Sequence, residues 1–306
     1  MSAAAARLPR PGSPSAWLLA CRPATLPAAV APVVVGASAA HAHGALRPGP
    51  TAAALAGAML LQIASNLAND VFDAEKGADT AERLGPVRAV QAGLLEARAV
   101  KRGLLVVLAL ALAVGSYLTW AAGPAIVVIG LCSMAAAVAY TGGPYPLGYH
   151  GLGDAFVFVF FGPVAVCGTA WVSLGFVPAL AVWTSVPIGA LATAILVVNN
   201  LRDRETDARA GKRTLAVRLG RRGALGEHAA LLAVAFLVPL ALALGGLAGW
   251  ATLAPWLSLP LAVRLARDVR AREGRALNAS LVATARLLAL FGALLGVGLW
   301  LGGHPG

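Results

Sequence analysis

Two short segments concentrate acidic and amide side chains in an otherwise apolar chain. The first reads SNLANDVFDAEKGAD (65–79) and the second reads NNLRDRETD (199–207). Only 12% of the 306 residues are charged, so both segments stand out. Residues three or four apart share a face of a helix. The residues that align in this way are Asn66, Asn69, Asp70 and Asp73 in the first segment and Asn199, Asp203 and Asp207 in the second.

Carboxylates on one helix face favour a bound cation, because they repel one another unless a positive charge lies between them. Mg²⁺ suits such a site, since it takes a few carboxylates, keeps several waters and shares its other positions with phosphate oxygens. Two facing clusters predict two or more Mg²⁺ ions that bridge a diphosphate, with the asparagines as secondary ligands. Basic side chains nearby would complete the anion site. They are Lys76, Arg83, Arg88, Arg202, Lys212 and Arg213.

The alternative interpretation of each segment is a solvated helix end with ion pairs one turn apart. A single cluster would not separate the two interpretations. Two clusters, each preceded by an asparagine at the same offset, form a weak internal repeat and favour the metal site.

The elements that carry these segments are predicted to be transmembrane helices. The chain is 59% apolar, whereas soluble domains are about half apolar and a quarter charged. The apolar runs are continuous and lack the alternation of barrel strands, so we expect an all-α membrane protein with about nine spans around a central cavity. The spans are expected near 24–42, 51–71, 100–119, 122–140, 155–173, 178–199, 228–246, 248–266 and 281–301.

The basic residues divide the connections into two groups. Loops 72–99, 200–227 and 267–280 hold most of the lysines and arginines between the spans, whereas the alternate connections hold only Arg47. The positive-inside rule therefore places the rich loops and the N-terminus in the cytoplasm, and the C-terminus outside. Rich Ala, Arg, Gly and Pro usage is typical of a GC-rich bacterial genome, so we expect a bacterial cell membrane.

The domain organisation is expected to be simple. Residues 1–16 lack the apolar core of a signal peptide, and we expect a disordered tail before a single transmembrane domain over 17–306. The 24 basic residues against 13 acids are typical of loops that face anionic lipid, and we expect no nucleic-acid partner. The cysteines Cys21, Cys132 and Cys167 lack metal-ligand spacing.

Four stretches together resemble the UbiA superfamily of intramembrane aromatic prenyltransferases, and within it the branch that acts on 1,4-dihydroxy-2-naphthoate. These are RPATLPAAVAPVVVG (22–36), NLANDVFDAEKGADTAERLGPVRAVQAG (66–93), YTGGPYPLGYHGLGDAFVFVFFGP (140–163) and the second acidic segment with its continuation to Gly220. The likeness covers residues 17–222, while the last third is similar only in being apolar and helical.

The resemblance implies a nine-helix bundle whose acidic motifs bind Mg²⁺ and a polyprenyl diphosphate. Asp70, Asp73, Asp203 and Asp207 match the family's motif carboxylates. The family's last position in the first motif is Gly77 here, and Asp79 fits the pattern of the naphthoate branch instead. The implied reaction transfers the prenyl group to 1,4-dihydroxy-2-naphthoate with loss of CO2 and diphosphate, giving demethylmenaquinone in menaquinone biosynthesis.

Aromatic and polar residues of the central stretch are candidates for the walls of the site. An allylic cation needs electron-rich neighbours, which tyrosine faces supply. Tyr140, as a catalytic residue, and Tyr145 and Tyr149 are candidates; the alternative is that they lie at headgroup level. The other candidates for the acceptor or prenyl site are Arg22, which could instead anchor to lipid, Gln91, His150 as a base or a simple hydrogen-bonding residue, and Asp154, a carboxylate that enters the membrane.

Other functions fit the pattern less well. An ion-coupled transporter would place ionisable residues near the middle of the bilayer, whereas these acids gather at one face. A CDP-alcohol phosphotransferase would carry one acidic motif and not two separated segments. Among UbiA-type enzymes, Pro144 stands where the hydroxybenzoate branch has a lysine, which disfavours that acceptor; homogentisate, chlorophyll-type and haem-side-chain prenyl transfer remain open.

Overall fold

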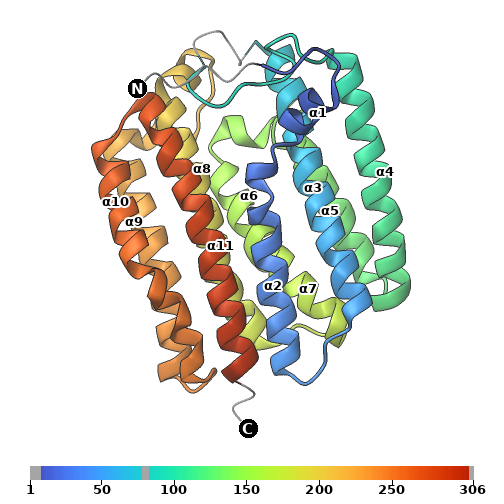
Figure 1. The fold of residues 1–306 in the computed structure, drawn as a ribbon, viewed down its shortest axis with the longest axis vertical. Coiled ribbons are helices and arrows are strands. Elements are labelled where there is room, and N and C mark those ends of the chain that lie inside the picture. Colours follow the sequence, from blue (N-terminus) through green and yellow to red (C-terminus); the bar gives the residue numbers. More distant parts are fainter. Residues whose placement is uncertain (1–7, 78–82, 303–306) are drawn as a thin grey trace.

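The computed structural model describes residues 8–77 and 83–302, and every regular element in these ranges is a helix. Long helices run side by side along the molecule (Figure 1). The all-α membrane class is therefore confirmed. The helices are α1 Pro14–Cys21, α2 Pro27–Ala42, α3 Pro48–Glu75, α4 Ala97–Ala122, α5 Ala125–Ala139, α6 Gly153–Val159, α7 Ala165–Leu174, α8 Ala179–Arg209, α9 Leu215–Leu244, α10 Leu259–Ala271 and α11 Leu277–Gly302.

Each of the nine predicted apolar stretches is helical, but the count of nine spans is not confirmed. Within the described residues, six helices are long and apolar enough to cross a membrane: α3, α4, α6 with α7, α8, α9 and α11. The helices α1 and α2 form a further candidate, bent by 48° at their junction. The helix α5 has only 15 residues, and the stretch predicted at 248–266 is a 3-10 segment, Trp250–Ser258, followed by the arginine-rich α10.

The connection predicted at 200–227 is mostly helical. The helix α8 continues to Arg209 and so carries the whole second acidic segment. The helix α9 begins at Leu215, where the Thr214 side chain accepts a hydrogen bond from the Val217 amide as an N-cap. The true connection is therefore residues 210–214, and Lys212 lies in it.

The helix α8 is the central helix of the bundle and α4 is peripheral. Inside the apolar window of α8, 72% of residues are buried, against 17% for α4. Its close neighbour is a π-helical turn, Phe160–Val164, between α6 and α7. A Cβ at Gly162 of this turn would lie only 2.9 Å from the Cα of Gly189 on α8, so glycine permits this approach.

Both acidic segments lie at one end of the bundle. The cytoplasmic ends predicted for α3 and α8 are at the same end as the start of α1, and α11 finishes at the opposite end (Figure 1). The Gly12 amide donates to the Leu94 carbonyl at 2.9 Å, which fixes the entry to α1 against the loop after the first acidic segment.

The predicted boundary of the N-terminal tail differs from the structure. The helix α1 begins at Pro14 with Ser13 as its N-cap, and Ala16 is fully buried against α3 and the loop that follows it. Residues 8–16 therefore belong to the folded protein, because small side chains let α1 pack closely. Residues 1–7 of the predicted tail lie outside the described residues.

Candidate active site

Lys212 joins the two acidic segments. Its Nζ lies 3.1 Å from Oδ1 of Asp73 on α3 and 4.0 Å from Oδ1 of Asp207 on α8. All three side chains are at most 14% exposed. Segments far apart in the sequence therefore share one site, and a positive charge already lies between their carboxylates.

Asp73 is the carboxylate with the most partners. Besides Lys212, its Oδ1 accepts a hydrogen bond from the Tyr149 hydroxyl at 2.7 Å, and its Oδ2 accepts one from Arg88 Nη2 at 3.1 Å. The ring of Tyr149 also lies beneath two ammonium groups, with Lys212 4.6 Å and Lys76 5.2 Å from its centroid. Two cations and a hydroxyl group therefore contact one buried carboxylate, and a third cation lies over the same tyrosine ring.

Asp70 has a different environment from Asp73, although both lie on the same face of α3. It is fully buried, and its two oxygens accept hydrogen bonds from the backbone amides of Ala89 and Val90 at 2.9 and 3.0 Å. Asp70 thereby holds the turn that immediately follows Arg88. These two hydrogen bonds fix the loop that carries Arg88, which pairs with Asp73.

The asparagines of the first segment connect α3 to its neighbours. The Asn66 amide donates to the Cys21 carbonyl at 3.0 Å and to Thr25 Oγ1 at 2.9 Å, at the bend between α1 and α2. The Asn69 oxygen accepts a hydrogen bond from Thr141 Oγ1 at 2.9 Å.

The second segment is organised around Arg202. Its guanidinium donates to both oxygens of Asp203 and to the Asn199 oxygen at 2.8 Å. The Arg202 side chain is completely buried and Asp203 is 9% exposed. A bidentate pair of this kind fixes both position and orientation of the carboxylate.

The donor set fits Mg²⁺ if a ligand completes the coordination. In the described ranges, no three or more His, Cys, Asp or Glu residues gather closely enough to hold an ion by themselves. Asp73, Asp203 and Asp207 are hard oxygen donors, and Mg²⁺ commonly uses one or two carboxylates with waters and phosphate oxygens. The ammonium between Asp73 and Asp207 marks a place that suits a cation. Asp79, predicted as a further ligand, lies outside the described residues.

Two tyrosines of the central loop, Tyr140 and Tyr149, lie at the site, and the third, Tyr145, is at the surface. Tyr140 lines the internal cavity, and a Cβ at Gly153 would lie 2.8 Å from its hydroxyl oxygen. Tyr145 is 57% exposed and stacks on His150 with ring centroids 3.6 Å apart. The Asp154 carboxylate is buried, and none of the residues in 8–77 and 83–302 forms a hydrogen bond with it.

The remaining predicted residues lie around this cluster. Lys76 donates to the Thr141 carbonyl at 2.7 Å, and the Arg213 backbone amide donates to the Tyr149 carbonyl at 2.8 Å. Arg83 donates to the Pro86 carbonyl at 3.0 Å. Arg22 forms the junction of α1 and α2 with a positive φ of 51°, and Gln91 is exposed on the turn that Asp70 holds.

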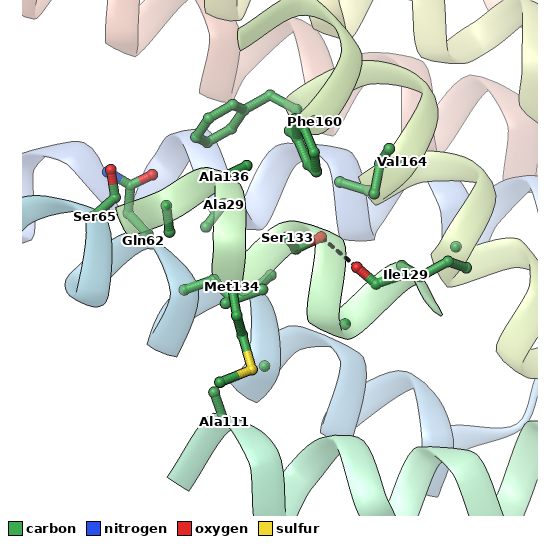
Figure 2. A pocket seen from close by; sticks show the side chains of 18 of the residues that line it. Ala29, Gln62, Ser65, Ala111, Ile129, Ser133, Met134, Ala136, Phe160 and Val164 are labelled. Carbon is green, nitrogen blue, oxygen red and sulfur yellow. Dashed lines mark hydrogen bonds between the residues drawn. The ribbon is translucent and has the colours of Figure 1, made fainter. Parts of the chain in front are cut away.

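An apolar cavity of about 340 Å³ extends from the acidic end into the bundle. Polar groups line it near the acids, and Figure 2 shows Gln62 and Ser65 together at one side, away from Val164 and Ile129. Ala54, Leu118 and Val172 line its far end. Asn69 and Ala54 are fifteen residues apart on α3, so the cavity is roughly 22 Å long at 1.5 Å per residue.

Sequence reasoning missed several polar residues that support the site. Thr25, Gln62 and Thr141 hydrogen-bond with the asparagines of α3, and Asn278 on α11 accepts a hydrogen bond from Arg202 at 2.8 Å. Thr141 follows Tyr140 directly in the quoted central stretch, which was a usable signal. Asn278 has no such signal, because it lies in the basic stretch 267–280, outside the segments that resemble the family.

A helical membrane bundle whose apolar cavity ends at buried acids and bases is built to bind an amphiphile with an anionic head. A match to the UbiA prenyltransferase family covers residues 29–282, and the chain belongs to this family. Curated relatives include the 1,4-dihydroxy-2-naphthoate octaprenyltransferases of Escherichia coli (43% identical; 83% of this chain, 84% of the relative) and Mycobacterium tuberculosis (41%; 84% and 87%).

Solved structures support the fold. A UbiA homologue from Aeropyrum pernix superposes with a TM-score of 0.68 at 18% identity, covering 88% of this chain and 97% of that one. A homologue from Archaeoglobus fulgidus, solved with DMAPP and Mg²⁺, gives 0.65 at 16% identity, covering 92% and 99%.

Proposed function

We propose that this protein is a Mg²⁺-dependent 1,4-dihydroxy-2-naphthoate polyprenyltransferase of menaquinone biosynthesis. The C–O bond between the prenyl group and its diphosphate breaks, and a C–C bond forms at the ring carbon that carries the carboxylate. That carboxylate leaves as CO2, diphosphate is released, and the product is the reduced form of demethylmenaquinone.

One observation carries the proposal more than any other: Lys212 lies between Asp73 and Asp207 at the polar end of an apolar cavity. A prenyl diphosphate has a matching shape, with a strongly anionic head and an apolar tail. The names of the relatives supply the acceptor, 1,4-dihydroxy-2-naphthoate.

The acidic segments would hold the metal ions. Asp73, Asp203 and Asp207 are the proposed ligands, with Asn69 and Asn199 close to them. Mg²⁺ bound there would neutralise the charge that develops on the leaving diphosphate, which is most effective where water is excluded. We propose that two or more Mg²⁺ ions bind in this way.

The chain's own cations would bind the diphosphate. Lys212 and Arg88 already pair with Asp73, so they are positioned to exchange that partner for phosphate oxygens. Lys76 lies over the ring of Tyr149 and would add a third cation. Arg202 is committed to Asp203 and Asn199, so we assign it to positioning the carboxylate.

The cavity would bind the prenyl chain and keep water from the allylic carbon. Tyr140 presents its ring at the polar end, where positive charge develops on that carbon as the diphosphate leaves. The naphthoate would enter beside Tyr140, below the central loop. We propose that this site faces the cytoplasm and that α11 ends outside, as the distribution of basic residues predicts.

A product assay tests the function. Membranes that contain the protein are incubated with dihydroxynaphthoate, Mg²⁺ and prenyl diphosphates of several lengths, and the products are analysed by mass spectrometry. We expect a prenylated product that has lost CO2 and that disappears with EDTA. Prenyl transfer to hydroxybenzoate but not to the naphthoate would overturn the proposed acceptor.

Two variants test the metal assignment in the same assay. Asp203→Asn and Asp207→Asn should each lower the rate at least about 100-fold while the protein still accumulates. Normal turnover in both variants would refute it.

A further inference from the structure

Asn278 connects the two acidic segments from a third element. It lies in the first turn of α11, and its side-chain oxygen accepts a hydrogen bond from Arg202 Nη1 at 2.8 Å. Its Nδ2 donates to the Leu84 carbonyl at 2.9 Å, in the loop after the first segment. The amide orientation is determined by these partners, since a flipped amide would face a donor with a donor and a carbonyl with a carbonyl.

The loop and Arg202 are also in direct contact. A Cβ at Gly85 would lie 2.6 Å from Arg202 Nη2, so the loop backbone presses against the guanidinium. Arg202 in turn donates to both oxygens of Asp203. A second link from the same region runs from Arg275 Nη2 to the Arg83 carbonyl at 3.4 Å.

The loop directly contacts the carboxylates of the first acidic segment. Arg88 in this loop pairs with Asp73, and the amides that follow it hold Asp70. The position of the loop therefore influences the carboxylates of α3, while Arg202 influences the carboxylate of α8. The amide side chain of Asn278 contacts both the loop and Arg202.

We propose that Asn278 is a positioning residue that sets the spacing between the carboxylates of the first and second acidic segments. The inference rests on the proposed function, since the spacing matters for a shared metal–diphosphate site. Removal of the amide should release the loop and loosen Arg202 without touching either substrate.

Steady-state kinetics and trypsin cleavage of the purified enzyme test this. Asn278→Leu should lower kcat about tenfold and raise the Mg²⁺ concentration for half-maximal rate severalfold, with the KM for the naphthoate unchanged. Trypsin should cut at Arg83 and Arg88 faster than in the wild type. The exposed neighbour Ala279 provides the matched control, and Ala279→Leu should change none of these values.

Two further variants keep the test decisive if Asn278→Leu does not accumulate. Asn278→Asp retains the acceptor for Arg202 but not the donor to Leu84, so faster loop cleavage is expected with a kcat between wild type and Asn278→Leu. Gly85→Ala displaces the guanidinium and should raise the Mg²⁺ requirement in the same way.

A double-mutant comparison separates positioning from general stability. In an Arg202→Met background, Asn278→Leu should lower kcat by no more than about twofold, because the guanidinium that Asn278 holds is already absent and the link between the two segments is already broken. Equal losses in both backgrounds, or an unchanged Mg²⁺ requirement and trypsin pattern in Asn278→Leu, would overturn the inference. An inactive wild-type enzyme would contradict the proposed function instead, while trypsin would still report the loop contact.

Discussion

At the scale of single residues, Asp70 and Asp73 are two carboxylates of the same type with different environments. Asp70 accepts hydrogen bonds from two backbone amides of the loop that follows α3. Asp73 instead contacts cations and the hydroxyl group of Tyr149. A carboxylate held by neutral amides is a rigid anchor, while one surrounded by movable cations can exchange its partners. The proposed chemistry therefore centres on Asp73 and its counterparts on α8.

The first prediction concerns Asp73. Asp73→Asn removes the charge that Lys212 and Arg88 share and should lower prenyl transfer at least about 100-fold. The rate at saturating substrate and a Mg²⁺ titration measure this. Glu205→Gln is the control, because Glu205 is an exposed carboxylate on α8 beside Asp203 and Asp207. Equal rates for Asp73→Asn and Glu205→Gln would exclude a role for Asp73.

The second prediction concerns Tyr149. Tyr149→Phe removes the hydroxyl that donates to Asp73 but keeps the ring under Lys212 and Lys76, so kcat should fall about tenfold. Tyr149→Leu removes the ring as well and should lower kcat further. Side-by-side kinetics of the two variants distinguish the contributions. A lower kcat in Tyr149→Leu but not in Tyr149→Phe would show that the ring contributes and the hydroxyl group does not.

At the scale of elements, helices α2 to α8 build the cavity. Small side chains on α3, such as Gly57 and Ala58, leave the space, and the π-helical turn after α6 supplies Phe160 and Phe161 to its wall. A cluster of Leu118, Ile126 and Val172 closes the far end. A prenyl chain longer than the cavity would have to leave it between helices.

The third prediction concerns the length of this cavity. Ala54→Phe fills its far end and should shift the enzyme toward shorter prenyl diphosphates in a competition assay, read as product masses. The lipid-facing neighbour Ala56 gives the control, since Ala56→Phe adds the same ring outside the cavity. An unchanged product distribution in Ala54→Phe would mean that the tail does not reach this end.

At the scale of the whole molecule, the acids, the basic loops and the start of α1 gather at one end of the bundle (Figure 1). The connection between α7 and α8, which contains the exposed Phe176, lies at the other end. Loops rich in lysine and arginine remain in the cytoplasm during insertion. The site should therefore be supplied with Mg²⁺ and the water-soluble acceptor from inside the cell.

The fourth prediction tests this orientation. In a variant without the natural cysteines, Phe176→Cys should react with a membrane-impermeant maleimide on intact spheroplasts. Glu205→Cys should react only after the membrane is permeabilised. The reverse pattern would contradict a cytoplasmic site.

The sequence by itself determined the helical membrane class, the acidic segments and the family. The class and the acidic segments follow from local composition and spacing, because an apolar run must hydrogen-bond its own backbone in lipid and residues three or four apart share a helix face. The family follows from the resemblance of four stretches of the sequence. Local sequence did not determine the number of spans, because α5 is short and arginines interrupt the stretch that forms α10.

Only the tertiary structure decided which carboxylate meets which partner. Asp70 and Asp73 look alike in the sequence, yet one holds the loop and the other faces Lys212, because the loop folds back over one side of α3. The link from Asn278 to Arg202 spans 76 residues and depends on how α11 packs against α8. Contacts of this kind form when helices that are far apart in the sequence pack together, so the local spacing of residues does not predict them.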